Sequence, residues 1–306
     1  MKVSVIIPTY NAEPYLATLL DTLQKQTLSF ELIIIDSSSS DKTIQIAKKH
    51  TEHIVTIPKN QFDHGGTRTK AAKLASGELL IFLTQDALPY DNYTLEKIIK
   101  PFYNPQVAAA YGRQIPYEQT NLFGKHLRAF NYPSTSHIRT LEDKIEYGIK
   151  TAFLSDSFAV YRKSAMQEVD WFKDGLILGE DSHIATKLLL ADYAIAYVAD
   201  AQVYHSHSYS LIEEFRRYFD IGVFHTHEHW ILETFGKAEG EGGKYVKSEL
   251  IYLLKHKAYL RIPEFFIRNG LKYLGYKFGK NYKVFPKNIV PKLSMHHLWW
   301  KKNYKY

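Results

Sequence analysis

Polar side chains follow three apolar runs of the sequence, at the points where strands of a sheet would end. These residues are Thr9, Tyr10 and Asn11 after the first run, Asp36 after the second, and Gln85 and Asp86 after a later one. Ligands of open parallel sheets bind beyond the carboxyl ends of the strands, so these positions predict one nucleotide-sized site. Asp36 could accept a hydrogen bond from a base or a ribose. Asp86, at a rigid and partly buried sheet end, suits a divalent metal ion that carries a diphosphate.

A turn with two glycines, Phe62-Asp63-His64-Gly65-Gly66-Thr67-Arg68, leads into a predicted helix. The glycines let backbone N–H groups approach an anion, the helix end supplies positive potential, and Arg68 can donate two hydrogen bonds to phosphate oxygens. The alternative is a tight turn with a surface arginine. We favour the anion site because the turn precedes a helix in the same half of the sheet. The segment is neither a dinucleotide fingerprint nor a P-loop, since the glycine and lysine spacing of both motifs is absent.

Two adjacent carboxylates, Glu180 and Asp181, stand at the start of a helix whose residues Ile184, Leu188 and Leu189 share one face. Asp181 could simply cap this helix. It could also point into the site as a general base, with Glu180 holding the local geometry. The residues alone leave the two interpretations open.

Histidines lie further along the chain in two groups. His205 and His207 follow a strand-like run and, taken alone, are more typical of structural residues. His225, His227 and His229 suggest a zinc site, because the first and the last share a helix face. Their spacing is not H-E-x-x-H, however, which favours a polar helix face beside an acceptor groove.

The elements that must position these residues alternate between strands and helices. Strands are predicted at 3–7, 31–35, 53–57, 79–83 and 107–111, and further on near 157–161 and 194–198. Helices are predicted around 15–23, at 42–49 behind the cap Asp41, and at 67–75. This order predicts right-handed crossovers and an α/β fold with an open, mostly parallel sheet flanked by helices. The segment 120–150 has weak periodicity and is predicted to form loops over the site.

The composition is that of an ordinary globular protein, with 306 residues, 45% hydrophobic residues and a formal net charge of +7. The absence of cysteine excludes disulfides, thiolate catalysis and cysteine zinc sites. No stretch free of acidic and basic residues exceeds twelve residues, which is short of the ~20 that a membrane-spanning helix needs. The first apolar run is short and ends in Pro8, which indicates a strand rather than a signal peptide, so we expect a cytoplasmic protein.

The charge is concentrated at the C-terminal end. Residues 244–306 carry 15 Lys and Arg against 2 acidic residues, a net of +13, and hold 14 of the 44 aromatic residues. The Gly-rich stretch 236–243 is therefore predicted to link a catalytic domain at 1–235 to a helical basic tail at 244–306. Basic and aromatic residues together favour an anionic membrane surface. Nucleic acid is not expected as a partner, because the first 243 residues carry a net charge of −6.

Two amphipathic helices are predicted in the tail. In the membrane interpretation they turn their basic residues, Lys272, Lys277, Lys280 and Lys283, toward lipid. The apolar positions of the same helices are Leu250, Leu254, Phe266 and Leu274. They would pack inward, on the catalytic domain or in a homodimer contact. The membrane and packing interpretations are compatible.

Taken in order, four segments resemble the family 2 inverting glycosyltransferases of GT-A fold. They are Val5-Ile6-Ile7-Pro8-Thr9-Tyr10-Asn11, Ile35-Asp36-Ser37-Ser38-Ser39-Ser40-Asp41-Lys42-Thr43, Thr84-Gln85-Asp86-Ala87 and Gly179-Glu180-Asp181. The segment 62–68, the Gln-Asp form of the metal motif, and Arg217-Tyr218-Phe219-Asp220 with Gly222 and Phe224-His225 resemble the bacterial rhamnosyltransferase branch. That branch uses dTDP-L-rhamnose to build O-antigens and cell-wall polysaccharides. The resemblance covers about residues 1–235.

The resemblance implies a nucleotide-sugar donor, a lipid-linked saccharide acceptor and a protein on the inner face of the plasma membrane. The implied donor-binding residues are Pro8, Thr9, Tyr10, Asn11, Asp36, His64, Arg68 and Gln85. Asp86 would hold Mg²⁺ or Mn²⁺ with His205 nearby, and Asp181 would be the base. The usual D-x-D motif is here Thr84-Gln85-Asp86, with one carboxylate. Gln85, His205 or water then completes the coordination, or the metal dependence is weaker than usual.

Two other protein classes share part of this pattern. A sugar-nucleotide nucleotidyltransferase would share the α/β opening, but it needs a Gly-rich basic loop after the first strand. This chain has Thr9-Tyr10-Asn11-Ala12-Glu13 there. A non-enzymatic nucleic-acid-binding protein would explain the basic tail and not the acidic remainder.

Overall fold

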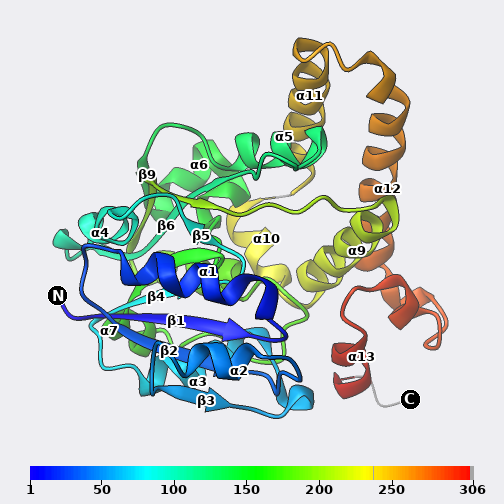
Figure 1. Ribbon diagram of the computed structural model, residues 1–306. Coiled ribbons are helices and arrows are strands. Elements are labelled where there is room, and N and C mark those ends of the chain that lie inside the picture. The colour runs from blue at the N-terminus through cyan, green and yellow to red at the C-terminus, as the bar shows by residue number, and fades with distance from the viewer. Residues whose placement is uncertain (237, 304–306) are drawn as a thin grey trace.

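The computed structural model describes residues 1–236 and 238–303, and a single β-sheet runs through its centre (Figure 1). The strands are β1 (Val3–Thr9), β2 (Glu31–Asp36), β3 (Ile54–Thr56), β4 (Leu79–Leu83), β5 (Leu88–Pro89), β6 (Val107–Ile115), β7 (His137–Arg139), β8 (Phe158–Arg162) and β9 (Ala194–Tyr204). Their order in the sheet is β3-β2-β1-β4-β8-β6-β9-β5, and β7 also pairs with β9.

Helices cover both faces of this sheet (Figure 1). They are α1 (Glu13–Gln24), α2 (Thr43–Ala47), α3 (His64–Leu74), α4 (Thr94–Ile99), α5 (Leu122–Asn131), α6 (Lys144–Tyr147), α7 (Lys163–Glu168), α8 (Glu180–Leu190), α9 (Leu211–His227), α10 (His229–Phe235), α11 (Glu239–Lys255), α12 (Ile262–Lys280) and α13 (His297–Asn303). The predicted α/β class is therefore confirmed.

The first half of the sheet is parallel, as predicted. β1 lies between β2 and β4, and β3 extends the sheet beyond β2. The register places Thr9 opposite Asp36, so the ends of β1 and β2 meet at the carboxyl edge. These strands could be recognised in the sequence because parallel strands, buried on both faces, are apolar almost throughout.

The second half of the sheet is mixed. β8 inserts between β4 and β6 and runs antiparallel to both. β6 pairs with β9 in parallel, and the short β5 and β7 pair with β9 in antiparallel. The prediction of a mostly parallel sheet did not anticipate these pairings, because a short buried apolar run has the same composition in either direction.

Residues 120–150 form more regular structure than the predicted loops. α5 begins behind Asn121, whose side chain accepts a hydrogen bond from the Gly124 N–H at 2.8 Å. Only three residues of α5 are buried, namely Phe123, Gly124 and His126. Leu122, Phe123, Leu127 and Phe130 of α5 follow a helical spacing, so the short helix left a signal that the weak periodicity of the whole segment obscured.

Alternate residues of the central strands enter two apolar layers, one on each face of the sheet. Ile6 and Phe82 face the layer that contains residues of α3, α8 and α9. Val5 and Ile81 face the layer that contains α1. Because the strands are held on both sides, the turns at their carboxyl ends start from fixed points.

The segment after residue 243 is packed onto this body. α12 crosses α9 in close contact, and the crossing depends on glycine. A Cβ atom on Gly279 would lie 1.9 Å from the carbonyl oxygen of Phe219, and one on Gly222 would lie 2.4 Å from that of Tyr276. Further on, Tyr282, Val290 and Trp300 enter the main core. The basic segment is thus joined to the catalytic body through a shared core.

The structure also differs from the predicted linker at 236–243. α11 begins at Glu239, so Gly240, Gly242 and Gly243 lie in its first turns, whereas Gly236 caps the end of α10. Glu241 pairs with Lys244 at 2.6 Å and with Lys150 at 3.6 Å, which stabilises these turns despite their glycine content. The two amphipathic helices predicted in the tail are α11 and α12.

The orientation predicted for these two helices is partly wrong. Lys272, expected to face lipid, is 7% exposed and lies within 4 Å of the carboxylates of Glu214 and Glu249. Three apolar residues expected to face inward are instead exposed, namely Leu254, Phe266 and Leu274. α12 carries apolar residues on two faces, so its pattern did not determine which face is buried. No helix within residues 1–236 or 238–303 is long and apolar enough to cross a bilayer.

Candidate active site

A buried polar cluster joins the ends of β1 and β2. Thr9 Oγ1 donates to Asp36 Oδ1 at 2.9 Å, and the Ser39 hydroxyl and N–H donate to the two Asp36 oxygens. Pro8, one residue earlier, is half-buried. These bonds fold the turn after β2 and keep the Asp36 carboxylate inside the protein. A contact from Thr9 or Asp36 to a nucleoside stays a prediction.

Gln85 connects the turn after β4 to the turn after β1. Its side-chain oxygen accepts from the Tyr10 N–H at 2.9 Å, and its amide donates to the Tyr10 carbonyl at 3.3 Å. The exposed Tyr10 ring has the Lys59 ammonium 4.4 Å from its centroid. Asn11 has a left-handed backbone, with φ of 47°, and accepts from the Ser40 N–H at 2.9 Å. Tyr10 and Lys59 therefore form an accessible rim on which an aromatic base could stack.

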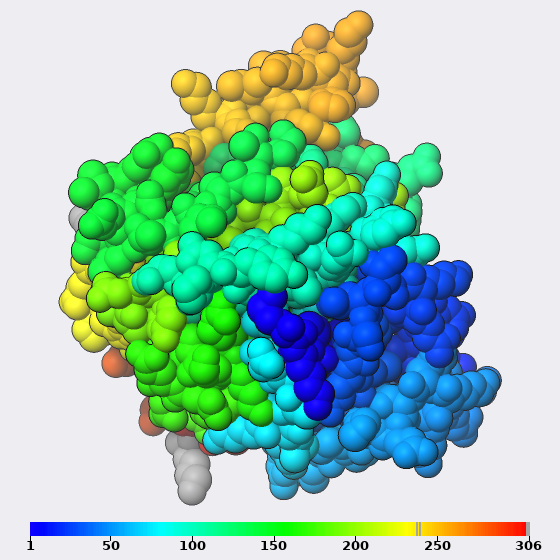
Figure 2. Space-filling model, turned by 90° about the vertical axis from the view of Figure 1, so that its left-hand side faces the viewer, coloured from blue at the N-terminus to red at the C-terminus, as the bar shows by residue number. Residues whose placement is uncertain are grey.

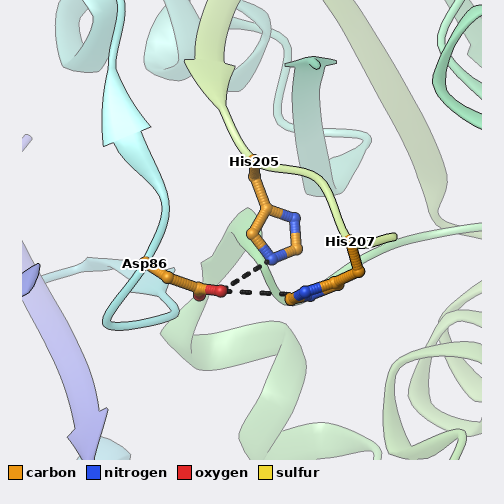
Figure 3. Close-up of side chains that lie close together, drawn as sticks. All are labelled: Asp86, His205 and His207. Carbon is orange, nitrogen blue, oxygen red and sulfur yellow. Dashed lines mark ion pairs between the residues drawn. The ribbon is translucent and has the colours of Figure 1, made fainter. Parts of the chain in front are cut away.

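Asp86, His205 and His207 point toward one another from two separate turns (Figure 3). The distance from Asp86 Oδ2 is 3.5 Å to His205 Nε2 and 3.9 Å to His207 Nε2. Each residue offers one ligand atom, and these atoms all lie within 4.8 Å of one another. Mixed nitrogen and oxygen ligands suit a transition-metal ion better than Mg²⁺, which takes oxygen ligands. The three residues thus fit a divalent metal ion.

The neutral tautomer of His205 is fixed by its neighbours. Its Nδ1 lies 2.8 Å from Gln114 Oε1. The Gln114 amide donates to Ser155 Oγ at 3.0 Å, so the amide oxygen is the acceptor of the Nδ1 proton. The lone pair of His205 is therefore on Nε2, on the side of Asp86, as a metal ligand requires.

The ionisation states of the three residues favour metal binding at neutral pH. Burial lowers the pKa of both histidines, that of His207 to about 4, so both imidazoles are neutral. Burial acts to raise the pKa of Asp86. In acid, where His205 is protonated, the hydrogen bond from its ring and the charge of the ring outweigh burial, and the pKa of Asp86 is held below its usual range. Near pH 7 the cluster then presents one negative charge and two lone pairs, with few protons to compete with a metal ion.

Arg68 lies buried between two carboxylates. Its Nε is 3.2 Å from Asp156 Oδ2, and its Nη1 is 3.0 Å from Glu180 Oε1 and donates to the His64 carbonyl at 2.9 Å. Burial opposes the charge of Arg68, but Glu180 and then Asp156 raise its pKa overall. The structure differs here from the predicted phosphate contact, because the guanidinium is enclosed by carboxylates.

Gly65 and Gly66 likewise serve the packing of α3. The Asp63 side chain accepts from the Gly66 N–H at 2.7 Å and caps the helix. A Cβ atom on Gly65 would lie 2.0 Å from the Lys173 carbonyl oxygen, so glycine allows that loop to approach α3. The predicted anion-binding turn is a capped helix start in contact with a neighbouring loop.

Asp181 is the second residue of α8 and is half-buried. Gly179, with φ of 82°, occupies the N-cap position, so the capping role considered for Asp181 is wrong. Burial and the negative charges of Glu180 and Asp156 raise the pKa of Asp181 to about 8. Glu180 has Arg68 as its partner, whereas Asp181 has no cation of its own. A half-exposed carboxyl group with a raised pKa has the properties of a general base.

Two arginines act on the metal-ligand cluster. The Arg128 Nε donates to the His205 carbonyl at 2.9 Å. Burial lowers the pKa of His64, His205 and His207, and the positive charge of the exposed Arg217 of α9 lowers each further. His64 lies 3.9 Å from the carboxylate of Glu180 in α8, and the other two histidines belong to the metal-ligand cluster. The charge of Arg217 thus reaches both groups of residues.

The C-terminal segment reaches His64 and the loop before α8. The His296 ring lies edge-on to the His64 ring, with 5.3 Å between centroids. Trp299, three residues later, donates from Nε1 to the Gly175 carbonyl at 2.8 Å, which holds the segment beside the loop that leads into α8. Residues predicted to lie in a separate tail thus complete the surroundings of Glu180 and Asp181.

Four residues of this site had no role assigned from the sequence: Asp156, His207, Arg217 and His296. A signal existed for His207, because H-x-H at a strand end places two imidazoles on one side. Asp156 and His296 belong to no motif, and only folding brings them to Arg68 and His64.

The zinc site considered for α9 is not formed. His225 Nδ1 lies 3.0 Å from the Tyr276 hydroxyl, and His227 Nε2 lies 2.9 Å from that of Tyr282. These contacts join α9 to the C-terminal helices. Within the residues that the structure describes, only Asp86, His205 and His207 group as possible metal ligands.

The strand-end turns and the metal cluster occur in a chain that matches a known family. Residues 4–170 match the model described as glycosyl transferase family 2. The chain belongs to this family. The resemblance that the ordered motifs predicted is thereby confirmed, and the family 2 match spans β1 to β8.

Curated relatives support the same membership over nearly the whole chain. The O-antigen chain rhamnosyltransferase RfbN of Salmonella typhimurium is 42% identical over 98% of this chain and 96% of its own length. The O-antigen chain rhamnosyltransferase WbaN of Salmonella anatum is 42% identical over 97% of this chain and 95% of its own. The matches continue far beyond residue 235, where the predicted resemblance ended.

Solved structures confirm the GT-A fold of this family 2 chain. The mannosyltransferase PcManGT from Pyrobaculum calidifontis, in complex with GDP-Man and Mn²⁺, superposes with a TM-score of 0.65 at 16% identity. It covers 92% of this chain and 88% of that one. TarS of S. aureus, residues 1–349 in complex with UDP-GlcNAc, gives a TM-score of 0.59 at 21% identity, over 96% of this chain and 84% of that one.

Proposed function

We propose that this chain is an inverting rhamnosyltransferase of O-antigen synthesis, which moves L-rhamnose from dTDP-L-rhamnose to a hydroxyl group of a lipid-linked glycan. The observation that carries this proposal is the 42% identity to two O-antigen chain rhamnosyltransferases over nearly the whole chain. The cluster of Asp86, His205 and His207 supports a donor that contains a diphosphate.

The metal ligands in this proposal are Asp86, His205 and His207. The chemistry of the donor set and the free Nε2 lone pair of His205 fit Mn²⁺, with Mg²⁺ as the alternative. A divalent ion bound there would neutralise negative charge on the leaving diphosphate. Gln114 and Ser155 keep the His205 ring in the orientation that this binding requires.

Asp181 is the general base in this proposal. Its carboxylate takes the proton of the acceptor hydroxyl while that oxygen forms a bond to the anomeric carbon. The bond from the anomeric carbon to the diphosphate oxygen breaks on the opposite face, so dTDP leaves with the bonding electrons and the configuration inverts. Arg68 and Glu180 are positioning residues in this proposal, because the buried Arg68 guanidinium is occupied by its ion pairs with Glu180 and Asp156.

Arg217 takes the role that the sequence suggested for Arg68. It is exposed on α9, and its charge acts on both metal-site histidines and on His64. A guanidinium in this place can donate two hydrogen bonds to a diphosphate. Titration of dTDP in the presence of Mn²⁺ into R217A and into the neighbouring R216A tests this role. We expect only R217A to bind at least about ten-fold more weakly, and equal affinities would remove Arg217 from the donor site.

The same comparison supports the proposed acceptor and location. A lipid-linked glycan is confined to a membrane, and the net charge of +13 over residues 244–306 supports peripheral attachment to the inner, anionic face of the plasma membrane. A homodimer contact is a second use that these residues could have.

The function is tested with a panel of nucleotide sugars and the wild-type protein. We expect dTDP-L-rhamnose to release the most dTDP in the presence of a lipid-linked O-antigen acceptor. The D181N variant should bind the same donor with unchanged affinity and release almost none. Equal release from all donors, or preference for a UDP or GDP sugar, would refute the rhamnose assignment.

A further inference from the structure

The outward face of α12 is a largely exposed apolar stripe, although Phe278 at its end packs against the rings of Phe215 and Phe285. Its exposed members recur four, seven and eight positions apart, as one face of a helix requires. They are Phe266, Ile267, Tyr273, Leu274 and Phe278, and we refer to them as the α12 stripe. The opposite face of α12 packs closely on α9 through Gly275 and Gly279. Isolated exposed apolar residues are ordinary, but a continuous stripe marks an interaction surface.

The α12 stripe begins next to the turn between α11 and α12. The orange helix pair projects from the body of the molecule (Figures 1 and 2). Leu260 in this turn is 96% exposed, and Tyr259 beside it is also exposed. Lys255, Lys257 and Arg261 flank the turn and are exposed as well. A projecting apolar residue with tyrosine and cations around it has the composition of segments that enter the bilayer interface.

We infer that the α12 stripe and Leu260 insert into the headgroup region of an anionic bilayer. The inference rests on the proposed lipid-linked acceptor and names the residues that meet the lipid. Insertion of apolar side chains supplies most of the binding free energy, and the surrounding cations add attraction to anionic headgroups. This differs from the arrangement predicted from the sequence, in which lysines of α12 faced the lipid and apolar residues faced inward.

Charge favours a bilayer over a second copy of the chain. Residues 244–303 contain two acidic residues, and neither is available at the stripe. Glu249 is fully buried, and Glu264 pairs with Arg261 and Arg268. A two-fold contact through this face would bring the same basic turn and helix of two copies together without acidic partners. Anionic headgroups supply the opposite charge.

The position of the stripe suits delivery of an acceptor to the metal site. From the inner face of α12, Arg268 pairs with Glu214 at 3.1 Å and donates to the Tyr209 carbonyl at 2.9 Å. Tyr209 lies two residues after His207, so one helix separates the stripe from the turn that carries two metal ligands. A glycan held at the bilayer surface could therefore reach the metal-ligand cluster while its lipid stays in the bilayer.

Flotation with liposomes tests the inference, using vesicles of phosphatidylcholine with phosphatidylglycerol. In the stripe variant, L260S/F266S/L274S, we expect the affinity for these vesicles to fall at least about ten-fold. The matched control is Y103S/I145S/L190S, which removes three exposed apolar residues outside α11 and α12. The control should float like the wild type. Wild-type binding should weaken without anionic lipid and persist in part at high salt, because salt screens only the charge attraction.

Three results would overturn the inference. The stripe variant could float as well as the wild type, or salt alone could abolish wild-type binding. Sedimentation without lipid could also show that the wild type is a dimer and the stripe variant a monomer. The stripe would then be a contact between two copies of the chain. Flotation needs neither donor nor acceptor, so an incorrect sugar assignment would appear in the donor panel and leave this measurement unchanged.

Discussion

Two neighbouring carboxylates at the start of α8 are in opposite electrostatic situations. Arg68 and His64 outweigh burial at Glu180 and hold its pKa below the usual range. Asp181 has the negative charges of Glu180 and Asp156 nearby, and burial adds to their effect in raising its pKa. The sequence left two interpretations open, in which Asp181 either caps the helix or acts as a base while Glu180 holds the local geometry. The fold pairs Glu180 with Arg68 and raises the pKa of Asp181 to about 8, which fits the proposed roles of the two residues.

This difference predicts the pH dependence of transfer. A raised pKa means that Asp181 stays protonated up to about pH 8, and only the ionised form can act as a base. With saturating donor and metal, the rate should therefore rise as pH increases toward about 8. D181N should lower kcat by roughly 10²-fold or more and lose this dependence.

The E180Q variant provides the control for this prediction. It removes a negative charge next to Asp181 and leaves the positive charge of Arg68 less compensated. Both changes should lower the pKa of Asp181, so the acidic limb of the pH–rate profile should move to lower pH. If the acidic limb stays at the same pH in E180Q, or is still present in D181N, a group other than Asp181 controls the pH dependence of the rate.

At the scale of elements, the crossing of α9 and α12 decides how Arg217 and the α12 stripe are presented. α9 carries Arg217 outward and Gly222 toward α12, and α12 carries Gly279 toward α9 and the stripe outward. The helices approach so closely because neither has a Cβ atom at the contact. The positions of Arg217 and of the α12 stripe thus depend on the same contact.

Substitution of Gly279 should therefore destabilise the whole protein. In G279A the new methyl group would lie 1.9 Å from the Phe219 carbonyl oxygen, which forces the helices apart. We expect a loss of about 1–3 kcal/mol in the free energy of unfolding, measured by urea denaturation.

Gly270 of the same helix is the matched control for this prediction. No atom lies within 4 Å of a Cβ atom built there, so G270A should be neutral or more stable by up to about 1 kcal/mol. If G279A and G270A unfold at the same urea concentration, the close crossing is not required.

The elements also show which features the sequence could predict. Strands β1, β2 and β4 and the residues at their ends were predictable, because buried parallel strands are apolar throughout and ligands gather at their ends. The direction of β8 was not, since it depends on how a long connection returns to the sheet. The partners of Arg68 were not predictable either, because Asp156 lies 88 residues away from it and is brought near only by that returning strand.

At the scale of the whole molecule, the composition predicts a domain boundary near residue 243, whereas the core of the fold continues across it. The net charge of +13 after residue 243 suggested a separate tail. Yet Trp300 is fully buried, and Asp220 accepts a hydrogen bond from the Met295 N–H at 2.9 Å. Charge is a property of the surface, whereas domain boundaries depend on where the core ends. The C-terminal segment shares the core of the catalytic body.

The segment around His296 should consequently be required for catalysis as well as for stability. His296 contacts His64, which lies 3.9 Å from Glu180, so it belongs to the group of residues that holds α8 and Asp181 in place. Burial lowers the pKa of His296 to about 3, so it is neutral at working pH and acts through packing. We expect H296A to reduce kcat several-fold while KM for the donor and the melting temperature change little. The neighbouring H297A, which removes an exposed ring, should leave all three unchanged.

A chain that ends at Leu293 should lose both Trp300 and His296, melt at a lower temperature and transfer no sugar. Full activity in that shortened chain would show that the basic segment is dispensable for the site, as the composition alone had suggested.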